Sequence, residues 1–239
     1  MPRKVPSGAD PVQLSVGNTI SERPYHGAFA MSSISRFSNI ESGVKRLYLG
    51  MLGKNPGAAA KTFAVLRNSR AQEDALFAIA EELDADGQVI LKAFWKVYKS
   101  LGKRRDQLAH HIWATEPQFP NDVALVEPNA LMNVELSTNI LKSDGIESAD
   151  QVIEIQKKMT AAVRLWSLED FKALDADCSL GTALSISVFM ALSASATEQQ
   201  RADAREVIGG SRMIRDFLPN HLRREPAARS ASQSSHIST

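Results

Sequence analysis

The sequence predicts a mainly α-helical protein, a helical bundle with a short extended or hairpin insertion. Apolar residues recur every three or four positions along most of the chain, which is the period of an amphipathic helix. Patterns typical of capping boxes precede several of these stretches, as expected where helices begin. With 239 residues, of which 44% are hydrophobic, the chain is long enough to bury a sizeable core.

The first predicted helix runs from about Ala28 to Leu52 and is ended by Gly53. A second helical region begins near Pro56 and restarts at Ser69. Ser69 and Gln72 have the spacing of a capping box, in which the hydroxyl caps the start of the helix. The apolar stripe of the first helix consists of Ile34, Phe37, Ile40, Val44, Leu47 and Met51.

A third predicted helix follows Gly87, and Gly102 marks its end or a bend. The segment from Lys103 to about Trp113 is expected to open another helix, which Pro117 ends. Two short apolar runs within residues 123–134 flank the sequence Glu-Pro-Asn, a pattern of either a small hairpin or an extended crossing. This is the non-helical insertion of the predicted bundle.

Helix is expected again from Ser148, where Ser148 and Gln151 repeat the capping-box spacing. Ser167 and Asp170 have the same spacing one helix later. Two further helices are predicted, over Leu180–Ala196 and Glu198–Ile208.

The ends of the chain are expected to be disordered tails, residues 1–25 and 219–239, which leaves residues 26–218 as one helical-bundle domain. The N-terminal stretch has four prolines and no sustained periodicity, and the C-terminal stretch becomes rich in serine. The longest uncharged run, 180–197, is shorter than the ~20 apolar residues of a membrane span, so no membrane association is expected. The single cysteine fits a reducing compartment, and we expect a cytoplasmic protein.

The segment RDQLAHHIW, Arg105 to Trp113, carries the most specific chemistry in the chain. On a helix, Asp106 and His110 are four residues apart and share a face, so the carboxylate is placed to orient the imidazole. Arg105 lies roughly 140° round the helix from His110, within reach of its long side chain. An arginine binds phosphate and a histidine transfers protons near neutral pH, so these are candidate catalytic residues.

This segment resembles the motif of the HEPN family, the "higher eukaryotes and prokaryotes nucleotide-binding" helical domains. The family motif is an arginine, a polar residue and then a histidine, matched here by Arg105, Asp106 and His110. The run LAHHIW is similar to the family's Leu-Ala-His-Gly-x-Trp, with His111 in place of the glycine. Two other pairings, Arg105 with His111 and Arg104 with His110, also have the family's spacing.

The resemblance implies metal-independent cleavage of RNA. His110 would take the proton of a ribose 2′-hydroxyl, and Arg105 would stabilise the charge of the pentacovalent phosphate. The resemblance also implies a homodimer, with an antitoxin or regulatory protein as a further partner and a role in stress response or defence. We expect no metal and no cofactor, because adjacent histidines on a helix point about 100° apart.

A row of lysines leads to the motif, independently of the resemblance. Lys92, Lys96, Lys99 and Lys103 are spaced for one helix face, and no acidic residue interrupts the chain between Lys92 and Arg105. Such a row suits a phosphate backbone, although the solvated side of an ordinary amphipathic helix has the same pattern. The predicted RNA-binding residues are Lys96, Lys99, Lys103, Arg104 and His111.

The alternative to an enzyme is a non-catalytic helical module that uses this surface to bind RNA, a nucleotide or a protein partner. In that case Arg105 and His110 would join helix to helix through a buried ion pair and hydrogen bond.

Overall fold

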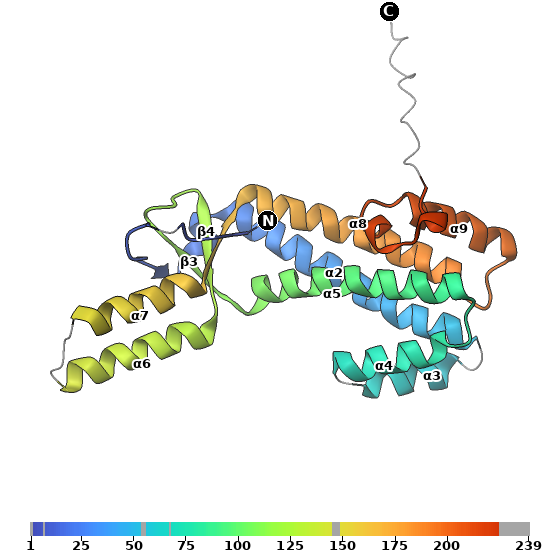
Figure 1. Cartoon of the computed structure of the whole chain (residues 1–239), viewed down its shortest axis with the longest axis horizontal. Helices are drawn as coiled ribbons and strands as arrows, with labels where there is room; N and C mark the ends of the chain where they lie inside the picture. Colours follow the sequence, from blue (N-terminus) through green and yellow to red (C-terminus); the bar gives the residue numbers. More distant parts are fainter. Residues whose placement is uncertain (1, 7, 54–55, 67, 145–148, 225–239) are drawn as a thin grey trace, which may run out of the picture. The chain divides into compact units, whose positions relative to one another are not determined.

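The computed structural model describes residues 2–6, 8–53, 56–66, 68–144 and 149–224. The described chain is mainly helical with one small antiparallel sheet, which confirms the predicted fold class (Figure 1). It divides into two compact units. Unit 1 comprises residues 1–40 and 99–180, and unit 2 comprises residues 41–98 and 181–239. Three long helices contribute to both units: α2 (Pro24–Leu52), α5 (Ala85–His110) and α8 (Leu168–Leu192).

The sheet belongs to unit 1 and has the strand order β1-β5-β4-β3-β2, with every neighbouring pair antiparallel. Its central strand β4 is buried along its whole length, so both faces of the sheet are covered. In the central register, Ala124 lies between Ala114 and Leu165. The strands are β1 (Arg3–Lys4), β2 (Ser15–Val16), β3 (Ile112–Thr115), β4 (Asp122–Val126) and β5 (Val163–Ser167).

The sheet packs against two groups of side chains. One group is a cluster of small and branched residues, and the other is formed by aromatic rings of β5 and α8. Ala124 and Leu165 belong to the first cluster, against which the partly buried Leu131 and Met159 pack. Elsewhere in unit 1, the rings of Trp166 and Phe171 lie 5.2 Å apart and both are fully buried. Burial of such large side chains stabilises the sheet against α8.

The expectation of a disordered tail over residues 1–25 is corrected by the sheet. Residues 3–4 and 15–16 are the two edge strands, and Val5 between them is only 8% exposed. The backbone N–H of Gln13 donates to the buried carboxylate of Glu116 at 2.5 Å, and Arg3 pairs with Asp122 at 2.5 Å. Two-residue strands are too short to show periodicity, and both pair with distant segments, Arg3 with Leu165 and Ser15 with Thr115.

The insertion is also different from the predicted hairpin. Residues 123–126 do form a strand, but the second apolar run lies in helix α6 (Pro128–Asp144), which pairs with α7 (Ala149–Ala162). Figure 1 shows these two helices side by side. Pro128 is the first residue of α6, a position where proline is favoured because its missing N–H would be unpaired anyway. The proline therefore starts a helix rather than a turn.

Helix α5 is continuous through Gly102, where the sequence predicted a stop or bend. A Cβ at Gly102 would lie 3.2 Å from Cζ of Phe37, so the glycine permits close approach of that ring. The motif segment consequently lies at the C-terminal end of a 26-residue helix, and not at the start of a new one.

Unit 2 is built from the remaining parts of the long helices together with shorter helices. Helix α4 is capped by Asn68, whose side chain accepts from the N–H of Ala71 at 2.7 Å. The side chain of Ser69, the predicted cap, lies outside the described part of the structure. Thr197 and Gln200 form a complete capping box at α9. The shorter elements are α3 (Pro56–Val65), α4 (Ser69–Ala80), α9 (Glu198–Gly210), η1 (Arg215–Phe217) and η2 (Asn220–Leu222).

The predicted caps and tail at the other positions have mixed outcomes. The Ser167–Asp170 cap of α8 is confirmed, because the Ser167 N–H and hydroxyl donate to the Asp170 carboxylate at 3.0 and 2.8 Å. Ser148 lies outside the described residues. Of the predicted C-terminal tail, residues 220–222 form η2, and residues 225–239 lie outside the described chain. The short helix α1 (Thr19–Glu22) completes unit 1.

Among the described helices, α8 alone is long and apolar enough to cross a membrane by length and composition. Its most apolar window has a mean hydropathy of 1.2 and is 33% buried. The core helix of a soluble protein can have the same length and composition.

Candidate nucleic-acid interface

The motif is held in unit 1 where α5 ends and turns into strand β3. The backbone N–H of His111 closes the last turn by donating to the Gln107 carbonyl at 3.1 Å. The indole N–H of Trp113 then donates to the carbonyl of Leu108 at 3.0 Å, which satisfies a helix-end acceptor. Leu108 itself is 3% exposed. Its burial fixes the rotation of the helix end, and with it the faces on which the motif residues lie.

Arg105 contacts both helix α2 and its neighbour Asp106. Its guanidinium carbon lies 4.7 Å from the ring centroid of the buried Phe37 on α2, and its Nη1 lies 3.2 Å from Oδ1 of Asp106. The first contact is a cation–π interaction and the second is an ion pair. The Arg105 side chain keeps 22% of its surface exposed, so solvent reaches part of the guanidinium.

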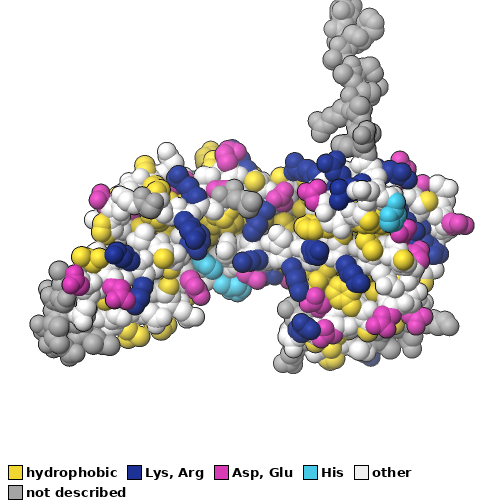
Figure 2. Space-filling view, in the orientation of Figure 1, with side chains coloured by type: hydrophobic (Ala, Val, Ile, Leu, Met, Phe, Trp, Pro, Cys, Tyr) yellow, Lys and Arg dark blue, Asp and Glu magenta, His cyan; other side chains and the backbone are white. Residues whose placement is uncertain are grey.

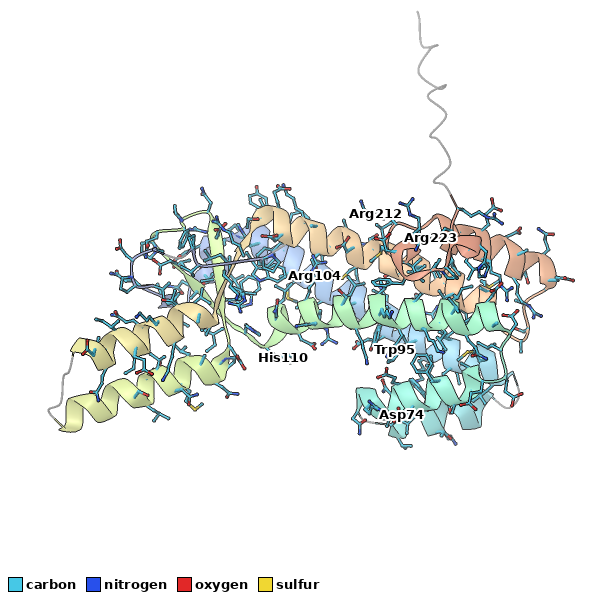
Figure 3. The ribbon with its side chains drawn as sticks, in the orientation of Figure 1. Asp74, Trp95, Arg104, His110, Arg212 and Arg223 are labelled. Carbon is cyan, nitrogen blue, oxygen red and sulfur yellow. The ribbon has the colours of Figure 1, made fainter. Side chains whose placement is uncertain are left out.

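Asp106 and His110 share a helix face but are not joined by a hydrogen bond in the part of the chain that the structure describes. The Asp106 side chain is 56% exposed and its carboxylate is paired with Arg105. His110 is the exposed last residue of α5 (Figure 3). The predicted trio therefore splits into an Arg105–Asp106 pair and a separate, solvent-accessible imidazole.

Arg104 joins α5 to α8. Its Nη1 lies 2.7 Å from Oδ2 of Asp177, and a parallel ion pair joins Arg36 on α2 to Asp175 at 2.9 Å. The fully buried Cys178 directly follows Asp177 on α8. Burial raises the pKa of its thiol to about 11. The thiol is therefore protonated at neutral pH, and Arg104 has a structural contact in addition to its predicted contact with RNA.

His111, the second histidine of the motif, is half-buried, and its Nδ1 has no hydrogen-bond partner among the described residues. Burial lowers its pKa because the charged imidazolium is poorly solvated there. Arg164 and His110 lower the pKa further, whereas Glu127 opposes the shift. The structure thus distinguishes the two histidines: His110 is accessible, while His111 is held neutral by packing.

The predicted lysines are divided between the units. Lys99 and Lys103 are exposed on the unit 1 part of α5, next to the motif. Lys96 belongs to unit 2, where its ammonium lies 5.4 Å from the ring centroid of Phe217. Figure 2 shows Lys and Arg side chains along α5 and a patch of histidine at its end. We name Lys99, Lys103, Arg105, Asp106 and His110 the α5 end surface.

The burial of His26 was not predicted from the sequence, because this residue directly follows the segment expected to be a disordered tail. This histidine is 7% exposed, and its ring meets Phe171 edge-on at 5.2 Å. Burial lowers its pKa, and its Nε2 has no hydrogen-bond partner within the described chain. Pro24 was the available signal, because a proline at the first position of α2 places His26 in the first helical turn.

No metal-ligand cluster of three or more His, Cys, Asp or Glu residues is present in the described ranges. Comparisons with known proteins gave no match: no family model, no curated protein and no solved structure matches this chain. The resemblance to the HEPN family therefore stays a prediction that rests on the motif.

Proposed function

We propose that the protein is a metal-independent endoribonuclease that binds RNA at the α5 end surface. The observation that carries the proposal is the exposed imidazole of His110 at the end of a helix that also presents Lys99, Lys103 and Arg105. The lysines supply charge for the phosphate backbone. The imidazole is then the one group of this surface suited to move a proton at neutral pH.

In the proposed reaction the neutral His110 imidazole accepts the proton of a ribose 2′-hydroxyl. The 2′-oxygen forms a bond to the adjacent phosphorus, and the bond from phosphorus to the 5′-oxygen of the next nucleotide breaks. A proton is returned to that leaving oxygen, which gives a 2′,3′-cyclic phosphate and a 5′-hydroxyl end. The guanidinium of Arg105 stabilises the extra negative charge on the phosphate in the transition state.

RNA binding without cleavage is the second candidate, and the Arg105–Asp106 ion pair favours it. Because the guanidinium is already held by Asp106 and Phe37, Arg105 must leave the carboxylate before it can grip a phosphate with its full charge. A surface of this kind binds the backbone electrostatically, whether or not His110 transfers a proton.

The two candidates separate in one assay with purified protein and labelled RNA in excess EDTA. The endoribonuclease predicts cleavage that is lost in His110→Ala and Arg105→Ala but kept in His221→Ala. His221 is a matched control, since it is an exposed histidine of unit 2 paired with Asp86. Binding that is retained by the wild type without any cleavage would support the second candidate.

The resemblance to the HEPN family leads to further proposals. We propose a cytoplasmic homodimer whose activity is controlled by an antitoxin or other regulatory protein, in stress response or defence. Sedimentation of the purified chain tests the dimer directly, because a monomer at micromolar concentration would contradict it.

A further inference from the structure

Unit 2 has a second basic surface, formed where the chain passes over it after helix α9. Residues 207–224 contain four arginines and one acidic residue, Asp216. Arg212, Arg215 and Arg223 are exposed, and Figure 2 shows Lys and Arg side chains gathered in the region where Figure 3 labels Arg212 and Arg223. This concentration of like charge is not explained by the α5 end surface, which belongs to unit 1.

An exposed aromatic ring lies within this basic segment. Phe217 is 45% exposed, although its neighbours Ile214 and Leu218 are 0% and 2% exposed and anchor η1 in the unit. The ammonium of Lys96 lies 5.4 Å from the Phe217 ring centroid. Burial of the neighbouring residues holds the ring at the surface, so part of a planar apolar side chain is exposed beside the ammonium of Lys96.

The backbone that carries these groups is fixed. The Nε of Arg223 donates to the Leu218 carbonyl at 2.8 Å, which keeps this side chain beside η1. The N–H of Arg224 donates to the carbonyl of Gly209 at 3.0 Å, and a Cβ at Gly209 would lie 2.3 Å from the Leu222 carbonyl oxygen. Close contact at this glycine thus ties the segment to α9, so the backbone that carries the cations and the ring is held in place before any ligand binds.

Among the described residues, the side chain of Arg215 makes no hydrogen bond or ion pair, so it needs to break no internal contact to bind an anion. We propose that Lys96, Arg212, Arg215, Phe217 and Arg223, here named the η1 surface, bind single-stranded nucleic acid. Phe217 stacks on one base, and the cations contact the flanking phosphates.

Single strands are favoured over other polyanions by the single exposed ring. A base pair in a duplex has its faces covered by its neighbours, so a ring at the surface has nothing to stack on. A membrane-binding surface needs several exposed apolar side chains, whereas Val207 and Phe217 are the only large exposed hydrophobic residues in the described segment 207–224. The inference extends the proposed RNA binding to unit 2, but it does not require catalysis by His110.

The test uses a fluorescent 12-nucleotide oligothymidylate, which lacks the 2′-hydroxyl and so reports binding without cleavage. Stacking on an aromatic ring contributes about 1–3 kcal/mol per base, so Phe217→Ala should weaken binding by about fivefold or more. Phe217→Leu keeps an apolar side chain for packing but removes the planar face, and should weaken binding similarly. Phe217→Tyr should bind within about twofold of the wild type, because it restores the ring.

The charged groups are tested by the salt dependence of the same binding. The double variant Arg215→Ala/Arg223→Ala should reduce the slope of log affinity against log salt by about 1.4, since each lost phosphate contact contributes about 0.7 for a single strand. Arg46→Ala/Lys61→Ala is the matched control, because both residues are exposed cations elsewhere in unit 2. That variant should keep the wild-type slope.

Wild-type affinity in both Phe217→Ala and Phe217→Leu would overturn the proposal, as would equal affinity for a duplex of the same length. The surface would instead bind lipid if Phe217→Ala weakened binding to anionic vesicles while all variants bound the oligothymidylate equally. The two surfaces are independent if His110→Ala abolishes RNA cleavage but Phe217→Ala still weakens oligothymidylate binding in that background. The oligothymidylate assay therefore tests the η1 surface even if the protein does not cleave RNA.

Discussion

Arg105 and Asp106 form an ion pair at the end of α5, with Nη1 and Oδ1 separated by 3.2 Å. The carboxylate therefore acts on the arginine and not on His110. It also adds negative charge at the place where a phosphate is proposed to bind, which raises the cost of anion binding there.

The Arg105–Asp106 relationship predicts that Asp106→Asn keeps RNA cleavage and binds RNA about threefold more tightly at low salt. The amide removes a negative charge and releases the guanidinium for phosphate. Binding and cleavage assays at two salt concentrations measure both effects. A loss of cleavage of about 100-fold, with RNA affinity unchanged, would instead indicate that Asp106 orients His110.

The Arg104–Asp177 ion pair is predicted to stabilise the fold of unit 1. Both side chains are partly buried, at 20% and 29% exposed, so their coupling should exceed that of a fully exposed pair and reach about 1 kcal/mol. A double-mutant cycle with Arg104→Ala and Asp177→Ala, read by urea unfolding, gives this coupling. Additive effects of the two substitutions would show that the pair contributes nothing.

The N-terminal strands are predicted to be part of the folded unit. Val5→Ala should lower the free energy of unfolding by about 2 kcal/mol, because Val5 is 8% exposed and its truncation leaves a cavity. Val16→Ala is the matched control, since Val16 is 54% exposed and should change stability by no more than about 0.5 kcal/mol. Equal effects of the two substitutions would mean that the segment is not packed on the sheet.

Stability is predicted to fall in acid because of His26. Its folded-state pKa is lowered from 6.5, mainly by burial and also by Arg23, with Asp122 and the Asn121 backbone opposing. The unfolded chain therefore binds the proton more tightly, so this contribution is complete above the unfolded pKa and is lost progressively as the pH falls below it.

Urea unfolding at pH 7.5 and 5.5 measures the loss of stability in acid. His26→Leu should reduce the difference between the two pH values. A smaller dependence will remain, because burial also lowers the pKa of His111. An unaltered pH difference in His26→Leu would contradict the assignment.

The helical class and the apolar stripes were predictable because they depend on local periodicity. The capped start of α8 was predictable because it depends on the local spacing of Ser167 and Asp170. The other features depend on contacts between distant residues. Gly102 has the sequence signal of a helix end, but it is needed because Phe37 packs against it. Two-residue edge strands have no pattern of their own. Pro128 fits either a turn or the first residue of a helix, and only the paired α7 decides between them.

The candidate site was predictable in its residue types but not in its pairings. Helical spacing correctly put Asp106 and His110 on one face, yet spacing carries no information about competition for a carboxylate. The adjacent Arg105 takes that carboxylate. The different exposure of His110 and His111 is likewise set by the turn from α5 into β3. The sequence predicted one helix over the whole segment, without this turn.

RNA cleavage by His110 through the 2′-hydroxyl determines the chemical ends of the products. A labelled RNA is incubated with the protein in EDTA, beside an RNA with a single 2′-deoxy nucleotide at the mapped cut site. Catalysis by His110 predicts 2′,3′-cyclic phosphate and 5′-hydroxyl ends, no cut at the deoxy position, and no products with His110→Ala. Products with a 3′-hydroxyl, or equal cutting at the deoxy position, would contradict it.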